Sequence, residues 1–316
     1  MIKCSNGGDF KIMFKKIIKQ ICEEENIKYK TISKDWVIVL EKNGVINLIT
    51  GYKFGDNNHA LGELLDDKYA TYELLNEMKL PTINYNIVYS KNNKNDYAAG
   101  CNSVDYVKEL FHKYNENVVL KVNDGTCGLN VKHIIDEGEL VQQYEDLTSK
   151  FFSISVCPFY EIENEYRAIV VNGKAELVYK KIRPIVVGDG KSTIKELLKQ
   201  FNSTYFSEKD DERFKEVLQE GEVFEYDWRF NLARGAKASL DFSSEIKMRV
   251  EELAEKISKK IGLGFGSIDI IKTANNQFLV MEINSGVMME NFIKQIPEGY
   301  EIAKNIYKKA IENLKW

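Results

Sequence analysis

Apolar side chains recur along the chain at two different spacings, which predict a mixture of helices and strands. Over residues 10–25 they return every three or four positions, the pattern of an amphipathic helix. Pro81 closes a second helical stretch, within which Asp66 and Asp67 favour a helix start. The same spacing predicts helices at 59–81, 104–114, 193–201, 248–263 and 302–316.

Two β-hairpins are predicted where turn residues separate β-branched runs. Asn43-Gly44 lies within residues 35–50, and Asn172-Gly173 lies between two longer runs. Asn-Gly favours the type I′ turn of a tight hairpin. Further strands are predicted at 83–90, 117–122, 264–273 and 277–284, and a solvated helix or flap at 205–225. Hairpins interleaved with helices indicate α+β lobes rather than a doubly wound parallel sheet.

Composition restricts the class of protein further. The 316 residues suggest two or three lobes, and 44% hydrophobic with 29% charged residues is ordinary globular usage. A net charge of -4 disfavours a general nucleic-acid-binding surface. No apolar run approaches the roughly 20 residues that span a bilayer. Five scattered cysteines without a Cys-x-x-Cys pair disfavour disulfides and zinc. We therefore expect a cytoplasmic protein without nucleic-acid or membrane partners.

The strongest chemical signal is a set of oxygen-bearing side chains on the two predicted strands at 264–284. Glu282 and Asn284 are two positions apart, so both project from the same face of a sheet. If the two strands are antiparallel neighbours, Asp269 lies beside them. Three oxygen ligands on one face suit Mg²⁺. The alternative is a polar, solvent-facing surface, but the apolar flanks indicate burial, and a buried acidic face needs a cation.

Two further segments carry weaker signals. Lys121 ends a strand and is followed by Gly125 and Gly128, so backbone N–H groups could approach phosphates beside the lysine. The loop lacks the Gly-Lys-Ser/Thr ending of a Walker A motif, and an ordinary turn is the alternative. The aromatic stretch 158–160, followed by Glu165, could hold an adenine and a ribose, or be a strand end and turn.

Arginines are rare in this chain, with six among 44 basic residues, and several lie beside turn glycines. Arg183 precedes Gly188, and Arg229, Asn231 and Arg234 precede Gly235. A flat, bidentate guanidinium is suited to clamping a phosphate or carboxylate. Each segment could equally be a solvated basic loop. Only the order of all the segments along the chain distinguishes an anion clamp from such a loop.

That order resembles the ATP-grasp superfamily, in its glutathione synthetase and cyanophycin synthetase-like branch, and within it a clostridial-type group. The resemblance covers about residues 60–295. Six segments carry it in order: DDKYATYELLNEMKLP, VVLKVNDGTCG, EYRAIVVNGK, VVGDGKSTIKELL, WRFNLARGA, and SIDII with VMEINSG.

The resemblance implies an α+β ATP-grasp fold in which two lobes hold ATP between their sheets. The boundaries would be a short N-terminal α/β unit at 1–60, an N-terminal ATP-grasp lobe at 61–150 and a C-terminal lobe with the metal site at 151–316. It also implies a ligase reaction. A substrate carboxylate attacks the γ-phosphate of ATP to give an acyl phosphate and ADP, and an amine then displaces phosphate, forming an amide.

The resemblance assigns roles position by position. Phosphates would be bound by Lys121, with Lys68 as a weaker partner, under a loop that Gly125 and Gly128 allow to close. Adenine would lie against Pro158, Phe159 and Tyr160, and Glu165 would accept from the ribose hydroxyls. Two Mg²⁺ ions, with Mn²⁺ as an alternative, would be held by Asp269, Glu282 and Asn284. The γ-phosphate and acyl intermediate would face Arg183, Arg229, Asn231 and Arg234.

Two departures from the family pattern affect these assignments. Many relatives have a second lysine at the position of Tyr72, so Lys68 is expected to be the weaker phosphate partner. The N-terminal unit is also short, so the acceptor site differs from that of relatives or involves a second chain, such as a homodimer partner. We expect small-molecule or peptide carboxylate and amine substrates. A small-molecule kinase and a non-catalytic nucleotide-binding regulator are the alternatives.

Overall fold

The computed structural model describes residues 11–126, 128–199 and 212–316. The chain begins with an α/β unit in which one face of a small antiparallel sheet packs on a helix. Asn43 and Gly44, at φ of 54° and 80°, form its first predicted turn. The elements are α1 (Lys11–Glu24), β1 (Lys28–Ile32), β2 (Val37–Lys42), β3 (Val45–Thr50) and β4 (Lys53–Phe54), in sheet order β1-β2-β3-β4.

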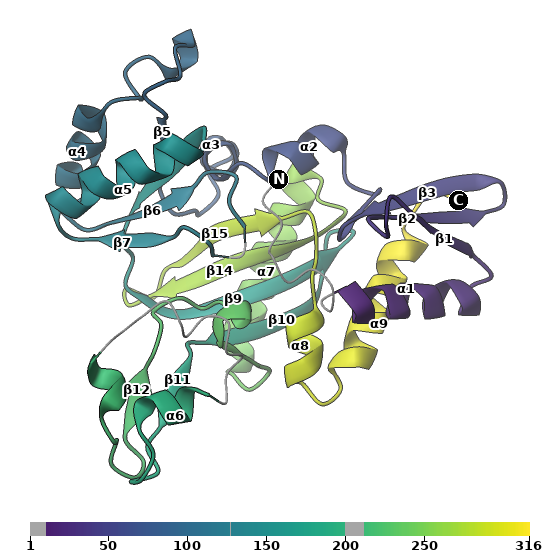
Figure 1. Ribbon diagram of the computed structural model, residues 1–316. Helices are drawn as coiled ribbons and strands as arrows, with labels where there is room; N and C mark the ends of the chain where they lie inside the picture. Colours follow the sequence, from purple (N-terminus) through teal and green to yellow (C-terminus); the bar gives the residue numbers. More distant parts are fainter. Residues whose placement is uncertain (1–10, 127, 200–211) are drawn as a thin grey trace.

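The second lobe is a four-stranded sheet covered on one face by two helices (Figure 1). Its elements are β5 (Asn86–Tyr89), α4 (Val104–Lys113), β6 (Val118–Val122), β7 (Lys132–Ile134), α5 (Glu137–Lys150) and β8 (Ser153–Pro158). The preceding helices α2 (His59–Leu64) and α3 (Lys68–Glu77) pack their leucines, among them Leu75, in the core of the third lobe. In the sheet order β5-β8-β6-β7, Val118 and Leu120 pack beneath α4 and α5. Because strand side chains alternate, Lys121 projects from the opposite face.

The third lobe is a five-stranded sheet in the order β13-β10-β9-β14-β15. Helix α7 packs one face through Val250, Ala254 and Ile257, which contact Ala168 and Ile268 in the same core. The elements are β9 (Ile162–Val171), β10 (Lys174–Ile182), β13 (Lys237–Ser239), α7 (Ser244–Ile261), β14 (Phe265–Thr273), β15 (Phe278–Asn284), α8 (Glu290–Gln295) and α9 (Gly299–Glu312).

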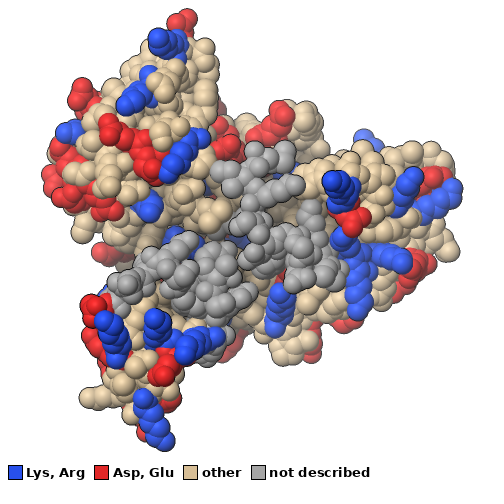
Figure 2. All heavy atoms as spheres, in the orientation of Figure 1, with Lys and Arg blue, Asp and Glu red and all other residues tan. Residues whose placement is uncertain are grey.

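A small projection leaves this lobe between β10 and β13 (Figure 1). It has its own core around Val186, Ile194 and Phe214. Its elements are β11 (Ile185–Val187), α6 (Ile194–Leu198), a 3₁₀ turn at Glu212–Lys215 and β12 (Val223–Glu225). Figure 2 shows basic and acidic side chains intermingled over the projection and over the lobe that carries α4 and α5.

The predicted α+β class is confirmed, because the pairings within the described sheets are antiparallel and helices cover their faces.

The helical stretch at 59–81 is two helices, because Asp67 caps the start of α3 by accepting from the Ala70 N–H. The stretch at 205–225 was predicted as a helix or flap. Residues 205–211 lie outside the described residues, and the rest holds the 3₁₀ turn and β12. Among the described helices, none combines the length and hydropathy required to span a bilayer.

Candidate active site

A group of charged side chains lies on the face of the five-stranded sheet that is opposite α7, between apolar residues of the same face. Asp269 on β14 pairs with Glu282 on β15 and with Arg167 on β9, and Ser267 pairs with Asn284. Directly paired residues of antiparallel strands point to the same face. The structure therefore brings the three predicted metal ligands to one face, as the antiparallel hypothesis required.

Asp269 is buried within a balanced group of four charges. Arg167 donates to both of its oxygens, from Nε at 2.7 Å and from Nη2 at 2.6 Å. Lys181 Nζ lies 3.0 Å from Oδ1 of Asp269 and 2.5 Å from Oε1 of Glu165. Burial opposes ionisation, but Arg167 and Lys181 hold the pKa of Asp269 well below its usual range. Burial raises the pKa of Glu165, and Lys181 offsets this only in part.

The oxygen donors on this face suit a magnesium ion. A carboxylate has about four acceptor positions, and the contacts of Asp269 use three of them, leaving one for a metal. The Glu282 side chain is 29% exposed and so is accessible. No three His, Cys, Asp or Glu residues of the described chain form a metal-binding group. An ion here would therefore need the Asn284 amide oxygen and oxygens from a substrate, which is how Mg²⁺ is commonly held.

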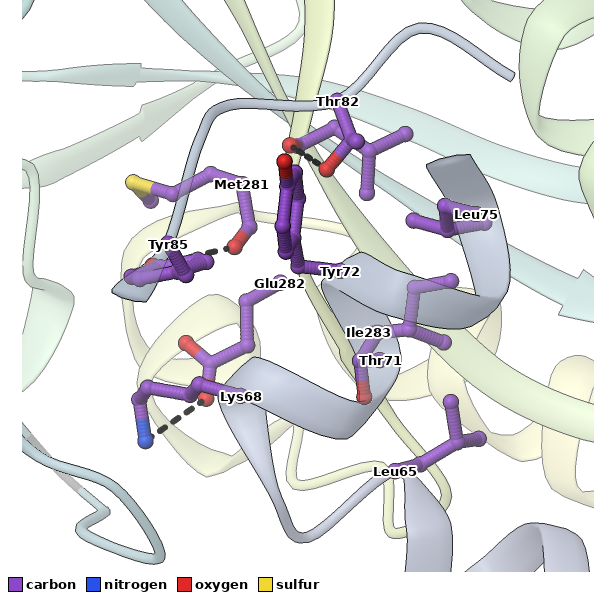
Figure 3. Close-up of a pocket in the computed structure, with 11 residues that line it drawn as sticks. Leu65, Lys68, Thr71, Tyr72, Leu75, Thr82, Tyr85, Met281, Glu282 and Ile283 are labelled. Atoms are coloured by element: carbon purple, nitrogen blue, oxygen red, sulfur yellow. Dashed lines mark hydrogen bonds and ion pairs between the residues drawn. The ribbon is translucent and has the colours of Figure 1, made fainter. Parts of the chain in front are cut away.

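Lys68 connects the glycine loop to this face. Its Nζ donates to the Gly125 carbonyl oxygen at 2.5 Å and to the Asn123 carbonyl oxygen at 3.3 Å. The same Nζ lies 3.9 Å from Glu282 Oε1, and Figure 3 shows the two side chains pointing toward each other. Burial lowers the pKa of Lys68, and Glu282 partly counteracts this. The structure thus brings together Lys68, Gly125 and Glu282.

Lys121 reaches the same region from the other sheet. Its Nζ donates to the Tyr85 hydroxyl at 3.1 Å and lies 5.3 Å from the centre of the Tyr85 ring. Tyr85 lines a small pocket between α3 and β15 that also includes Lys68 and Glu282 (Figure 3). The two predicted phosphate lysines therefore approach the site from different elements, α3 and β6.

The glycine loop is docked on the segment that contains the predicted arginines. Gly128 has a φ of 66°, and a Cβ there would lie 2.6 Å from Asn231 Nδ2. A side chain at this position would be strained by the positive φ and would displace the Asn231 amide group. Arg229 Nη1 donates to the Gly128 carbonyl oxygen at 3.4 Å. Gly128, Arg229 and Asn231 are thus adjacent.

Asp227 holds this arginine segment in place. Its carboxylate is 3% exposed and accepts from Arg229 Nη2 at 2.7 Å and from Arg234 Nε at 3.3 Å. Burial opposes its ionisation, but hydrogen bonds from Arg229 and the charges of both arginines lower the pKa of Asp227. Asn231 Oδ1 accepts from the Ala233 N–H, which fixes the 3₁₀ turn that carries Arg234.

Arg183 lies at the root of the projection. It pairs with Glu225 at 3.1 Å, donates to the Ile162 carbonyl oxygen at 2.8 Å and lies 4.7 Å from the Phe230 ring centre. Among the described residues, its ion pair is with Glu225 and not with Asp227 or Asp269. The structure places Arg183 next to the arginine segment through its contact with Phe230.

An apolar cluster fills the space between the two large sheets. It combines Val119 and Cys157 of one sheet with Ile271 and Leu279 of the other. Phe159 and Tyr160 pack against it, and Pro158 ends β8 beside them. Phe159 stacks on His133 with ring centres 3.9 Å apart, and Trp228 lies 5.7 Å from Phe159. A flat aromatic base would suit such a cluster. Glu165 instead lies on the charged face, 4% exposed and paired with Lys181.

Sequence reasoning did not select Tyr85 or Asp227, and it gave no individual role to Arg167, Lys181 or Trp228, although these three lie in segments that it singled out. Arg167 and Asp227 could have been found, because each lies two positions from a residue that was selected, Glu165 and Arg229. Tyr85 carries no sequence signal, since an aromatic residue beside a strand is usually core.

Comparison with known proteins shows a similarity to ATP-grasp proteins over part of the chain. A model described as a RimK-like ATP-grasp domain matches residues 216–310, which contain the metal strands and the arginine segment. Cyanophycin synthetase of Geminocystis herdmanii is 27% identical over 233 residues, covering 66% of this chain and 25% of that protein. The Synechocystis cyanophycin synthetase is 29% identical over 217 residues, covering 60% and 24%.

Solved structures agree with this similarity. A bifunctional glutathione synthetase from Pasteurella multocida superposes with a TM-score of 0.54 at 14% identity, covering 93% of this chain and 44% of that one. The chain therefore has the ATP-grasp fold, and its residues 216–310 are similar to a RimK-like ATP-grasp domain. The ATP-grasp fold is shared with the D-alanine–D-alanine ligase of Bacillus anthracis, with a TM-score of 0.54, 15% identity and coverage of 81% and 68%. The chain spans about a quarter of the length of the curated relatives that it matches.

Proposed function

We propose that this ATP-grasp protein is an ATP-dependent carboxylate–amine ligase. The observation that carries the proposal is the meeting of three groups at one place. Lys68 contacts the carbonyl of Gly125 in the glycine loop and lies 3.9 Å from Glu282 on the acidic sheet face. A polyphosphate next to bound magnesium needs cations and carboxylates close together in this way.

The remaining residues receive roles that follow from their positions. Phe159, Tyr160 and Trp228 would hold the adenine between the sheets, and Lys121 and Lys68 would neutralise the phosphates. Magnesium would be held by Glu282 and Asn284, with Asp269 contributing one oxygen, and would withdraw charge from the γ-phosphate. Arg229 and Arg234 would stabilise the negative charge that develops as a substrate carboxylate attacks.

The proposed reaction has two steps. The substrate carboxylate attacks the γ-phosphorus, the bond to the β-phosphate oxygen breaks, and ADP leaves. An amine then attacks the acyl carbon, loses a proton and displaces phosphate, leaving an amide. Catalysis by this chain would rest on positioning and charge stabilisation, since the mechanism forms no covalent bond to a side chain. We propose small-molecule or peptide substrates, in line with the relatives named cyanophycin synthetase and glutathione synthetase.

The test is to incubate the protein with ATP, Mg²⁺ and pools of amino acids and dipeptides, following ADP, phosphate and product mass. We expect equal ADP and phosphate, and a product one water lighter than its two parts. Glu282→Gln should lower turnover by at least about 100-fold, since it removes a carboxylate charge at the metal. Glu163→Gln on the same sheet, 48% exposed, is the control and should retain activity.

Two other results would replace the ligase proposal. ADP with a product that gains one phosphoryl group would indicate a small-molecule kinase. ATP binding without ADP formation from any carboxylate pool, unaffected by Glu282→Gln, would indicate a nucleotide-binding regulator.

A further inference from the structure

Tyr85 is a buried tyrosine whose hydroxyl joins the two large sheets. The residue is 3% exposed and precedes β5 of the second lobe. Its hydroxyl lies 3.1 Å from Lys121 Nζ on β6 and 3.3 Å from the carbonyl oxygen of Met281 on β15. Figure 3 shows the Tyr85 side chain directed at that carbonyl. One hydroxyl therefore contacts elements of both lobes.

The direction of each hydrogen bond follows from the chemistry. Burial raises the pKa of Tyr85, so the phenol is neutral and has one hydrogen to donate. A carbonyl oxygen can only accept, so that hydrogen points to Met281. The lone pairs of the phenol oxygen are then directed to Lys121, which can only donate. The Met281 carbonyl fixes the orientation of the Tyr85 hydroxyl, and the hydroxyl oxygen in turn fixes the position of the Lys121 ammonium group.

These hydrogen bonds restrict the position of the Lys121 side chain. A lysine side chain has four rotatable bonds, and fixing it costs conformational entropy. The Tyr85 hydroxyl and ring, 5.3 Å from the ammonium, restrict that freedom before any ligand arrives. Met281 immediately precedes Glu282, so the same tyrosine sets Lys121 relative to the strand that carries the metal carboxylate.

We propose that Tyr85 is a positioning residue that orients Lys121 toward the phosphates of ATP. The proposal rests on the proposed function, because it requires ATP to bind in this cleft. The proposal distinguishes the contribution of the phosphates to ATP affinity from the contribution of the adenosine part. Tyr85 should influence the affinity for phosphates, which Lys121 contacts, and should have little influence on the affinity for adenosine, which lacks them.

The test is a double-mutant cycle read by calorimetric titration with ATP and, separately, with adenosine. Tyr85→Phe keeps the ring and removes only the hydroxyl. We expect it to weaken ATP binding about tenfold, as loss of one hydrogen bond to a charged group does, and to leave adenosine affinity within about twofold. In Lys121→Met the same change at Tyr85 should have no further effect. Tyr89→Phe on β5, whose ring packs on Phe152, is the matched control and should bind both ligands normally.

The outcomes distinguish this inference from the function on which it rests. Wild-type protein that binds no ATP would overturn both. Wild-type binding with equal losses of ATP and adenosine affinity in Tyr85→Phe would show a purely structural role. Additive losses in the double variant would show that Tyr85 does not act through Lys121. Adenosine binding also reports that each variant retains a folded cleft.

Discussion

Asp56 is a residue whose burial predicts an unusual dependence of stability on pH. Both of its carboxylate oxygens are buried and lack a hydrogen-bond partner within the described residues. One of them would lie 2.9 Å from a Cβ at Gly264, so the site is closely packed. Burial raises the pKa of Asp56 to about 6, because nearby backbone N–H groups compensate only in part.

The sign of the pH effect follows from that shift. The native state binds a proton more readily than the unfolded chain, so stability falls as pH rises from about 4 to 6 and stays reduced above. Asp56→Asn removes the charge, and we expect it to raise the free energy of unfolding by about 1–3 kcal/mol at pH 8 and to have little effect at pH 4. Urea unfolding at both pH values measures this. Asp96→Asn, at an exposed position, is the control; an equal effect of Asp56→Asn at both pH values would contradict the assignment.

At the scale of elements, the sequence best predicts the turns and helices whose conformation is determined by residues close together in the chain. The turn at Asn172-Gly173 has φ of 47° and 77°, as a type I′ hairpin requires. Helices α1, α4, α7 and α9 lie where apolar spacing placed them. The pairing of Asp269 with Glu282 does not follow from the turn alone, because the turn register would pair Asp269 with Met281 and a shift between Asp269 and Ile270 brings Glu282 opposite it. The short strands β7 and β13 were not foreseen, since three residues are too few for a period to show.

A β-bulge explains why the charged group around Asp269 was not foreseen. A regular hairpin about Asn172-Gly173 would pair Glu165 with Lys180. The register shifts between Ala175 and Leu177, so Lys181 is the residue opposite Glu165. A one-residue slip moves every later side chain to the other face. Long-range packing fixes the bulge, and the hairpin sequence alone does not reveal it.

The bulge predicts that substitutions of two neighbouring lysines, Lys180 and Lys181, differ in their effect on stability. Lys181 is 3% exposed and serves both Glu165 and Asp269. Lys181→Met leaves a buried excess of negative charge, and we expect it to lower the free energy of unfolding by about 3–5 kcal/mol. Lys180→Met, one position away on the opposite face, should change it by less than about 1 kcal/mol. Denaturant unfolding of both variants measures this, and equal losses would argue against the observed register.

At the scale of the whole molecule, the first and last elements of the described chain share one hydrophobic core. Ile17, Ile18 and Ile21 of α1 lie in the same cluster as Ile306 and Ile311 of α9. The Phe14 and Tyr307 rings are 5.0 Å apart, and Lys304 pairs with Glu24 at 2.6 Å. The lobe of α4, α5, β6 and β8 has a separate core. The domain boundary predicted near residue 60 stays a prediction. Because the shared core includes residues on both sides of this boundary, it bears on which elements fold and unfold together.

We predict that α1 and α9 unfold together, because neither can expose its half of a shared core without exposing the other. Native-state hydrogen exchange should give the slowest amides of both helices the same free energy of opening. Ile18→Ala should lower that free energy in both helices by about 2–4 kcal/mol, while β6 keeps its protection. Leu140→Ala, in the core beneath α5, should give the reverse pattern. If Ile18→Ala affected α1 alone, the N-terminal unit would be an independently folding domain docked on the rest.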